Sequence, residues 1–148
     1  MKETFRALVM ENASQPARSV QEWDTGRLPD AEVTVKVAYS SVNYKDALVG
    51  VKGDFVKSYP FIPGIDLAGT VLASADSRFK EGDEVIVTSY KLGTGHFGGF
   101  SEMARVPAAW VVPLPKGLTL RESMILGTAG FTAALSVQKL EDHGLKPG

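Results

Sequence analysis

A glycine-rich stretch is the first candidate for chemistry in this sequence. Residues 93–98 read GTGHFG, the G-x-G-x-x-G spacing that binds a dinucleotide pyrophosphate at a helix N-terminus. The pattern follows a predicted strand, but the next residues, FSEMARVP, are typical of a strand stopped by Pro107 and not of a helix. We therefore interpret it as a glycine-rich loop and not as a nucleotide site. Two roles are open for the loop: a mobile segment beside a cleft, or a surface hairpin without function.

Side chains that bind metals are scarce. The sequence contains no cysteine, which excludes disulfides, thiolate zinc sites and cysteine nucleophiles. Its two histidines, His96 and His143, are expected in a loop and at a helix end, where solvated side chains are commoner than metal ligands. A catalytic zinc ion requires three protein ligands. The sequence therefore predicts no metal site.

The bulk composition is that of an ordinary folded domain. Of 148 residues 44% are hydrophobic and 22% charged, and 16 basic against 17 acidic residues give a net charge of −1. Without a run of basic residues there is no electrostatic argument for binding nucleic acid or an anionic membrane. No apolar segment has the length of a signal-peptide core or a membrane span. We expect a soluble, cytoplasmic protein.

Short strands separated by glycine and proline occupy most of the chain. They are expected at residues 5–10, 32–37, 66–74, 83–90, 99–106 and 110–114. The clearest reads EVTVKV, where valines alternate with polar residues as in a strand with one solvated face. A short helix is expected at 44–49, with Ser41 or Asn43 as its N-cap. This density of strands favours a small barrel over alternating βαβ units.

The last part of the chain has a helical pattern. A capping box at residues 119–122 predicts the start of a helix. Gly127 and Gly130 are expected to divide the segment into a short helix and a longer one that starts near Thr128, and Gly144 suits the C′ position of the longer helix. Because this longer helix has an apolar band that needs a partner surface, we expect the isolated chain to pair with itself, to aggregate or to have a disordered tail. The band comprises Phe131, Ala134, Leu135, Val137 and Leu140.

Five stretches taken together resemble one protein family. They are SSVNYKDALVG (40–50), YPFIPGIDLAGTV (59–71), FKEGDEVIV (79–87), GGFSEMARVP (98–107) and GTAGFTAALSV (127–137). Their order and spacing resemble the medium-chain dehydrogenase/reductase superfamily, and within it the zinc-independent quinone oxidoreductase branch that includes acrylyl-CoA reductase. The resemblance covers nearly the whole chain.

The resemblance implies a fold that is mainly β with short helices: a GroES-like, partly open β-barrel that bears the substrate site, followed by the first helices of a Rossmann domain that binds NADPH. Residues 1–120 would form the barrel domain, and residues 121–148 the incomplete start of the cofactor domain. The chain would be the N-terminal portion, inactive by itself, of a homodimeric oxidoreductase that reduces quinones, conjugated enones or enoyl thioesters without zinc. The alternative is a stand-alone GroES-like barrel that acts as a binding or structural module.

The resemblance also implies a set of site residues. Asn43 stands where zinc-bearing relatives have a cysteine, and Ile65 and Asp66 stand where they have a histidine–glutamate pair. Without a metal, the negative charge that grows on a substrate carbonyl oxygen needs hydrogen-bond donors, and a proton must follow. Asn43 and Tyr44 are the expected catalytic donors, and they would also contact the cofactor. Asp66 is expected to be a structural hydrogen-bond partner.

Five residues near this turn or farther along the chain have roles that the sequence leaves less defined. Thr128 matches a threonine that approaches the nicotinamide in relatives, and helix N-capping explains the same residue without a cofactor. Tyr90 is either part of the substrate wall or a cross-strand packing residue, and Ile65 is expected in an apolar substrate floor. Asp46 either orients the turn or simply caps and solvates the helix. Lys45 either reaches a cofactor phosphate or is surface charge.

Overall fold

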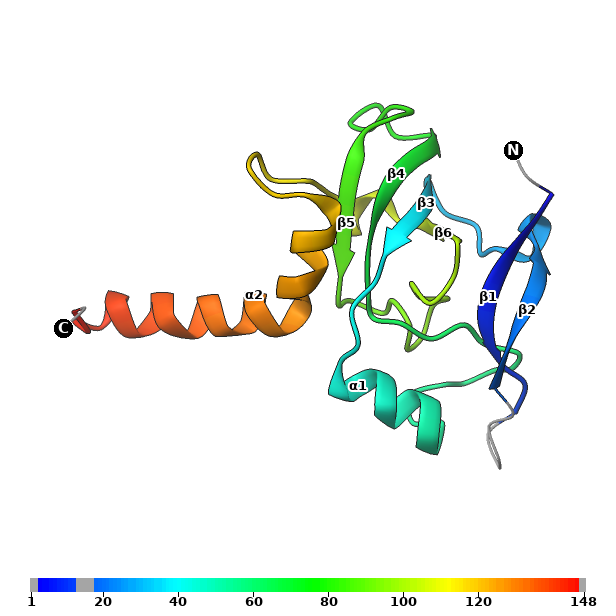
Figure 1. Ribbon diagram of the computed structural model, residues 1–148, viewed down its shortest axis with the longest axis horizontal. Coiled ribbons are helices and arrows are strands. Elements are labelled where there is room, and N and C mark those ends of the chain that lie inside the picture. The colour runs from blue at the N-terminus through cyan, green and yellow to red at the C-terminus, as the bar shows by residue number, and fades with distance from the viewer. Residues whose placement is uncertain (1–2, 13–17, 147–148) are drawn as a thin grey trace.

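The computed structural model describes residues 3–12 and 18–146 and is mainly β (Figure 1). Its strands are β1 (Thr4–Met10), β2 (Arg18–Asp24), β3 (Val33–Tyr39), β4 (Asp66–Ser74), β5 (Glu84–Thr88), β6 (Met103–Val106) and β7 (Val112–Pro113). Its helices are the 3-10 turns η1 (Thr25–Arg27) and η3 (Ala108–Trp110), the π-helix η2 (Leu48–Lys52), and the α-helices α1 (Tyr44–Ala47) and α2 (Leu120–Asp142). The expectation of a β fold with short helices is confirmed.

Two antiparallel sheets make up the body of the molecule. Five strands pair in the order β6-β3-β4-β5-β7, and β1 pairs with β2 in a separate ribbon. The ribbon is joined to residues 100–102, just before β6: the Leu8 N–H donates to the Phe100 carbonyl, and the Glu102 N–H donates to the Arg6 carbonyl, both at 2.8 Å. These bonds connect β1 to the segment that leads into β6, the edge strand of the five-stranded sheet. The two sheets together therefore form the partly open barrel that was expected.

The alternating valines of β3 lie on the buried face, as predicted. Val33 and Val35 are 0% exposed and belong to the main core. Thr34, which the alternation places on the solvated face, is buried as well, because the Arg105 side chain lies over it and donates to its hydroxyl at 3.2 Å. The main core comprises Val33, Val35, Leu67, Val71, Phe79, Val85, Val87, Leu92, Ala104, Val106, Ala108 and Val111.

The strand predictions need four corrections. β5 ends at Thr88 and not at residue 90, because Ser89 and Tyr90 leave the extended conformation with φ values of 64° and 50°. β6 begins at Met103 and not at residue 99, because the preceding glycines hydrogen-bond back to residues 62–64. β7 keeps only two residues, because η3 occupies the start of the predicted strand at 110–114. The strand β2 is absent from the sequence prediction. It buries one residue, Trp23, so its sequence shows no alternation that would reveal it.

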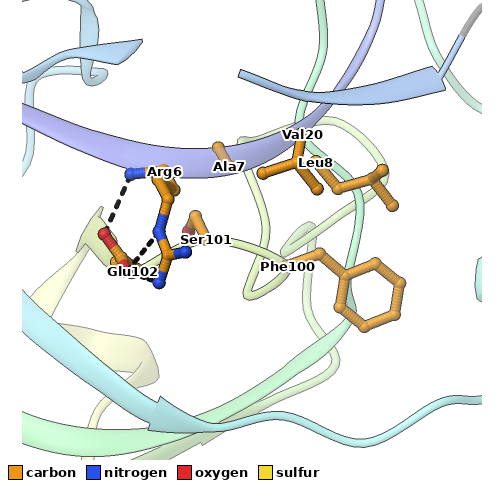
Figure 2. A pocket seen from close by; sticks show the side chains of 7 residues that line it. All are labelled: Arg6, Ala7, Leu8, Val20, Phe100, Ser101 and Glu102. Atoms are coloured by element: carbon orange, nitrogen blue, oxygen red, sulfur yellow. Dashed lines mark hydrogen bonds and ion pairs between the residues drawn. The ribbon is translucent and has the colours of Figure 1, made fainter. Parts of the chain in front are cut away.

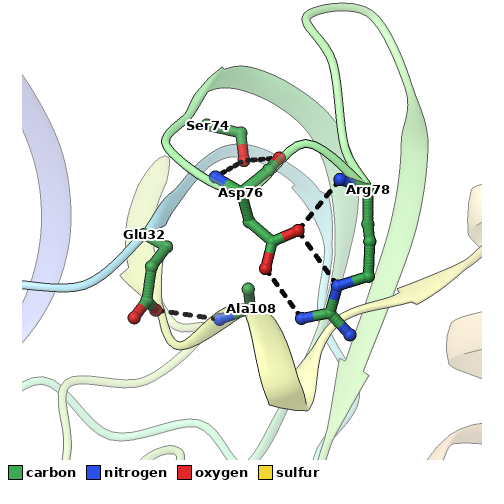
Figure 3. Close-up of polar contacts among 5 residues, drawn as sticks. All are labelled: Glu32, Ser74, Asp76, Arg78 and Ala108. Carbon is green, nitrogen blue, oxygen red and sulfur yellow. Dashed lines mark hydrogen bonds and ion pairs between the residues drawn. The ribbon is translucent and has the colours of Figure 1, made fainter.

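A pair of polar contacts fixes the loops beside β4 and η3 (Figure 3). The Arg78 guanidinium forks onto the Asp76 carboxylate at 2.8 and 3.0 Å, and this contact lowers the pKa of Asp76 to about 2. Glu32 accepts a hydrogen bond from the Ala108 N–H at 3.1 Å and so caps the start of η3. The Asp76–Arg78 contact lies at the surface, and the Glu32–Ala108 contact is part-buried.

The helix α2 confirms most of the expectations for the C-terminal segment. Its capping box is formed: the Thr119 N–H donates to the Glu122 carboxylate at 2.9 Å, and the Glu122 N–H donates back to the Thr119 hydroxyl at 3.2 Å. The helix is broken at Gly127 but not at Gly130. It ends at Asp142 with His143 as its C-cap, and Gly144 has the positive φ expected at C′.

The second half of α2 projects away from both sheets (Figure 1). Every residue from 131 to 142 is exposed, so the described chain does not bury the apolar band of this helix. None of the helices in residues 3–12 and 18–146 combines the length and the apolar character required to cross a membrane.

Candidate active site

Asp66, the first residue of β4, is 0% exposed and lies at the centre of a hydrogen-bond network. Its carboxylate accepts from the Ser41 hydroxyl at 2.8 Å and from the Asn43 side-chain amide at 3.0 Å. Thr128 donates twice, from its N–H at 2.9 Å and from its hydroxyl at 2.6 Å. Asp66 forms no ion pair with any described residue, so these four hydrogen bonds offset the burial of its carboxylate. Its expected role as a structural hydrogen-bond partner is confirmed.

The turn after β3 reaches Asp66 because β3 and β4 are neighbours. Tyr39, the last residue of β3, pairs with Ala68, so residues 40–43 run alongside the start of β4. The Ser40 hydroxyl donates to the Asp66 carbonyl at 2.7 Å and fixes this arrangement. Asn43 then takes the extended backbone conformation of an N-cap and starts α1, as predicted.

Asp46, in the first turn of α1, is a second buried carboxylate. It accepts from the Asn43 N–H at 2.8 Å and from the Ile65 N–H at 2.9 Å. Burial raises the pKa of Asp46, the two N–H donors act in the opposite direction, and the charge of Asp66 raises it further. Of the two interpretations of Asp46, orientation of the turn is therefore favoured over simple solvation.

Gly127 allows α2 to deliver two donors to Asp66. Its φ of 51° and ψ of −162° lie in a region that is essentially restricted to glycine. A Cβ atom at this position would stand 2.6 Å from the Ser41 hydroxyl oxygen and 2.9 Å from Asp66 Oδ2. The break turns the N–H and the hydroxyl of Thr128 toward the carboxylate, so the helix restarts against the barrel.

Ser89 extends the network outward. Its hydroxyl oxygen lies 3.0 Å from the hydroxyl oxygen of Thr128. Because Thr128 directs its own proton to Asp66, Ser89 is the donor in this pair, and the chain of hydroxyls runs from Ser89 to Thr128 to Asp66. We call Ser41, Asn43, Asp66, Ser89 and Thr128 together the Asp66 cluster.

The structure brings some of the predicted site residues together and separates others. Asn43 and Thr128, 85 positions apart in the sequence, meet on the same carboxylate oxygen. Tyr44 follows Asn43 and is 79% exposed, so its hydroxyl is accessible. Ile65 is only 2% exposed and is covered, so an apolar floor formed by its side chain would lie beneath the surface.

Tyr90 packs against an aromatic partner that the sequence analysis did not name. Its ring stacks on Trp110 with a centroid distance of 5.5 Å and an angle of 5° between the planes. The edge of the His96 ring meets the same indole at 5.3 Å. The expectation of a solvated His96 is wrong: the side chain is half-buried, burial lowers its pKa, and its Nε2 has no hydrogen-bond partner among the described residues.

The glycine-rich loop has a packing role, and it lacks the structural context that a nucleotide fingerprint requires. No helix follows it, and β6 comes next in the chain. Cβ atoms at Gly93 or Gly98 would collide with the backbone of Pro63 or Gly64, and one at Gly99 would collide with the Asp66 carbonyl. These glycines let the loop lie directly on the segment that leads into β4.

The described residues contain no group of three histidine, aspartate or glutamate side chains placed to hold a metal ion. A separate groove of about 330 Å³ lies between β1 and residues 100–102 (Figure 2). It is lined by Ala7, Leu8, Val20, Phe100 and Ser101 and bordered by Arg6 paired with Glu102 at 2.6 Å. None of these residues belongs to the Asp66 cluster.

Residues 29–116 match the family described as the alcohol dehydrogenase GroES-like domain. The matched segment covers more than half of the chain and includes both sides of the turn that carries Asn43. The chain therefore belongs to this family.

The most informative relatives are bacterial oxidoreductases. The acrylyl-CoA reductase AcuI of Ruegeria pomeroyi is 51% identical over 148 residues, which are 97% of this chain and 45% of that protein. The solved structure of Bacillus subtilis YhfP with NAD bound is 55% identical with a TM-score of 0.93, over 99% of this chain and 45% of its own. That of E. coli K-12 YhdH with bound NADPH is 50% identical with a TM-score of 0.91, over 95% and 44%. The chain spans less than half the length of these relatives.

Four residues at or beside the candidate site were not predicted from the sequence to be site residues. Ser41 was considered only as a helix cap, Gly127 only as a helix break, and Ser89 and Trp110 only as parts of predicted strands. Ser41 and Gly127 lie inside stretches that carry the family resemblance, which is a signal that was available. Nothing local in the sequence marks Ser89 or Trp110, because their roles depend on partners 39 and 20 positions away.

Proposed function

We propose that this chain is the substrate-side domain of an NADPH-dependent oxidoreductase that reduces quinones, conjugated enones or enoyl thioesters without zinc. The observation that carries the proposal is the meeting of Asn43 and Thr128 on the Asp66 carboxylate. These are the residues that the resemblance assigns to the reacting centre, and they lie 85 positions apart in the sequence. Family membership and the names of the relatives support the same reaction class.

The polar chemistry is assigned to Asn43 and Tyr44. One N–H of the Asn43 amide is held by Asp66, and the other remains to face a substrate oxygen. The exposed Tyr44 hydroxyl is a second donor, and it can release a proton once negative charge has grown on that oxygen. Asp66 orients Asn43, and Asp46 fixes the backbone of the turn, so both act as positioning residues. We assign the exposed Tyr90 to the substrate side of the site and the covered Ile65 to the apolar layer beneath it.

The surface beside the Asp66 cluster suits the nicotinamide end of a cofactor. Three exposed side chains with large apolar surfaces lie next in sequence to residues that touch Asp66. Val42 and Tyr44 flank Asn43, and Leu126 precedes Gly127. Such a surface matches a flat, mainly apolar ring, and Thr128 would lie next to it. When bound, NADPH supplies the hydride. The pyrophosphate would be held outside this chain, since the only glycine pattern of that spacing here is the packed loop at 93–98.

We also propose the division at residue 120, with a barrel domain before it and the start of a cofactor domain after it. α2 begins at Leu120, four residues after the end of the family match, and its second half has no partner in the described chain. The longer protein would be a homodimer.

The full reading frame should oxidise NADPH in the presence of quinones, enones or acrylyl-CoA, measured by absorbance at the nicotinamide band. Failure with all three substrate classes would overturn the proposal. The 148-residue chain alone should show no saturable NADPH binding by calorimetry. Tight binding would contradict the assignment of the cofactor site to another domain and would favour a self-sufficient binding module.

A further inference from the structure

The stacked pair of Tyr90 and Trp110 presents an aromatic surface beside the Asp66 cluster. The two rings are nearly parallel, so one face of Tyr90 is covered by the indole. The side chain is nevertheless 64% exposed, which leaves much of the phenol ring accessible. A large exposed aromatic ring backed by a second ring is a surface on which a further planar group can stack.

The backbone holds this ring in an unfavourable conformation. Ser89 and Tyr90 have φ values of 64° and 50°, in the left-handed region that residues other than glycine seldom adopt. Contacts hold both residues: the Ser89 N–H donates to the Ile65 carbonyl at 2.9 Å, the Ser89 hydroxyl is bonded to Thr128, and the Tyr90 ring stacks on Trp110. Strain of this kind persists where the surroundings fix it, and it is commonest at functional sites.

Trp110 contacts His96 as well as Tyr90. The His96 ring meets the indole edge-on, and burial lowers the pKa of His96, which favours the neutral imidazole. The faces of tyrosine and tryptophan rings are electron-rich. A neutral, electron-poor ring is therefore a better partner for this surface than an acyclic acyl chain.

We propose that Tyr90, supported by Trp110, is a specificity-determining residue that selects a planar, electron-poor carbonyl ring of the quinone class over an acyclic enoyl thioester. The inference rests on the proposed function, because it places this surface at the substrate side of the same site. Ser89 provides the link, since it precedes Tyr90 and hydrogen-bonds to Thr128 of the Asp66 cluster.

Binding can be followed in the 148-residue chain without reductant or turnover. The sequence has two tryptophans, and Trp23 is only 2% exposed, so a ligand stacked on Tyr90 should quench mainly the Trp110 fluorescence. The absence of cysteine excludes thiol addition to the quinone. Titration with 1,4-naphthoquinone should give a saturable quench, corrected for absorption by the quinone. Cyclohexane-1,4-dione, a saturated ring with the same carbonyl spacing, should bind at least fivefold more weakly.

Three variants separate a stacking role from a general effect of mutation. Tyr90→Leu should weaken naphthoquinone binding about fivefold, and Tyr90→Phe, which keeps the ring, should bind within about twofold of the wild type. Phe55→Leu is the matched control: Phe55 is also exposed and also has a positive φ, but it contacts neither Trp110 nor His96. It should leave binding unchanged.

Equal binding by wild type and Tyr90→Leu would overturn the inference, and so would equal binding of the saturated dione. Quenching by coenzyme A as strong as that by naphthoquinone would also overturn it, because the surface would then bind purines. These outcomes are independent of NADPH oxidation by the full reading frame. A chain that binds naphthoquinone but belongs to an inactive protein would refute the proposed function and leave the ring-binding surface in place.

Discussion

Replacement of Asp66 tests whether one carboxylate holds the candidate site together. Its Oδ2 accepts from Ser41, from the Asn43 amide and from the Thr128 N–H, and its Oδ1 accepts from the Thr128 hydroxyl. In Asp66→Ala all four donors lose their acceptor. The two hydroxyls can turn toward other partners, but the Thr128 N–H and the Asn43 amide N–H can only donate.

The expected cost follows from these two donors. A buried donor without an acceptor costs about 1–3 kcal/mol, and since both donors are part-buried we take the lower half of that range for each. Asp66→Ala should therefore lower the free energy of unfolding by about 2–4 kcal/mol. In Asp66→Asn the oxygen of the amide can occupy the Oδ2 position and keep three hydrogen bonds, while its NH₂ group donates to the Thr128 hydroxyl. One amide N–H is left over, so the cost should be about 1 kcal/mol.

Urea unfolding at pH 7, followed by far-ultraviolet circular dichroism, measures both values. Asp76→Asn is the control, because Asp76 is a surface carboxylate whose partner is Arg78, and it should change stability less than either Asp66 variant. Amide hydrogen exchange adds a local measurement: the Thr128 N–H should lose protection in Asp66→Ala. If Asp66→Ala unfolds at the same urea concentration as the wild type, the Asp66 cluster is not the structural link that we describe.

Three further changes give measurable outcomes. Gly127→Ala should destabilise the fold by about 1–3 kcal/mol more than Gly117→Ala, because both positions have positive φ but only the first places a Cβ against other atoms; equal urea midpoints would contradict the role of the break. Burial raises the pKa of Asp46 above its ordinary value of 3.8. The stabilisation that comes from this shift is therefore complete below pH 3.8 and is lost as the pH rises through the pKa of the folded protein. The free energy of unfolding of the wild type relative to Asp46→Asn should fall with rising pH, and a rise would refute the assignment. In the full-length protein Tyr44→Phe should lower kcat about 100-fold with little change in KM, and an unchanged kcat would remove Tyr44 from the chemistry.

The sequence predicted the local features of the fold well. The valine alternation located β3, the capping box located the start of α2, and glycine at 127 located its break. These signals are local: a side-chain period, a cap and a backbone conformation each depend on a few consecutive residues. β2 was missed because it buries a single side chain, and a strand with one buried residue has no period to detect.

The candidate site was predicted in its parts but not in its arrangement. Asn43 and Thr128 were named from the family resemblance, and the structure places both on Asp66. The supporting roles of Ser89 and Trp110 could not be predicted, because each depends on contact with a residue far away in the sequence. His96 was expected to be solvated, since a lone histidine in a glycine-rich loop has no local signal for burial against Trp110.

The sequence by itself determined the secondary-structure pattern, the absence of cysteine chemistry and the family to which the chain belongs, because these depend on residue types and short-range order. Only the tertiary structure decided that a carboxylate at the start of β4 gathers donors from the turn after β3 and from the broken helix α2. The physical reason is that a buried carboxylate must have all its donors within about 3 Å, and residues from positions 41 to 128 meet that condition only after the sheet has brought β3, β4 and β5 side by side.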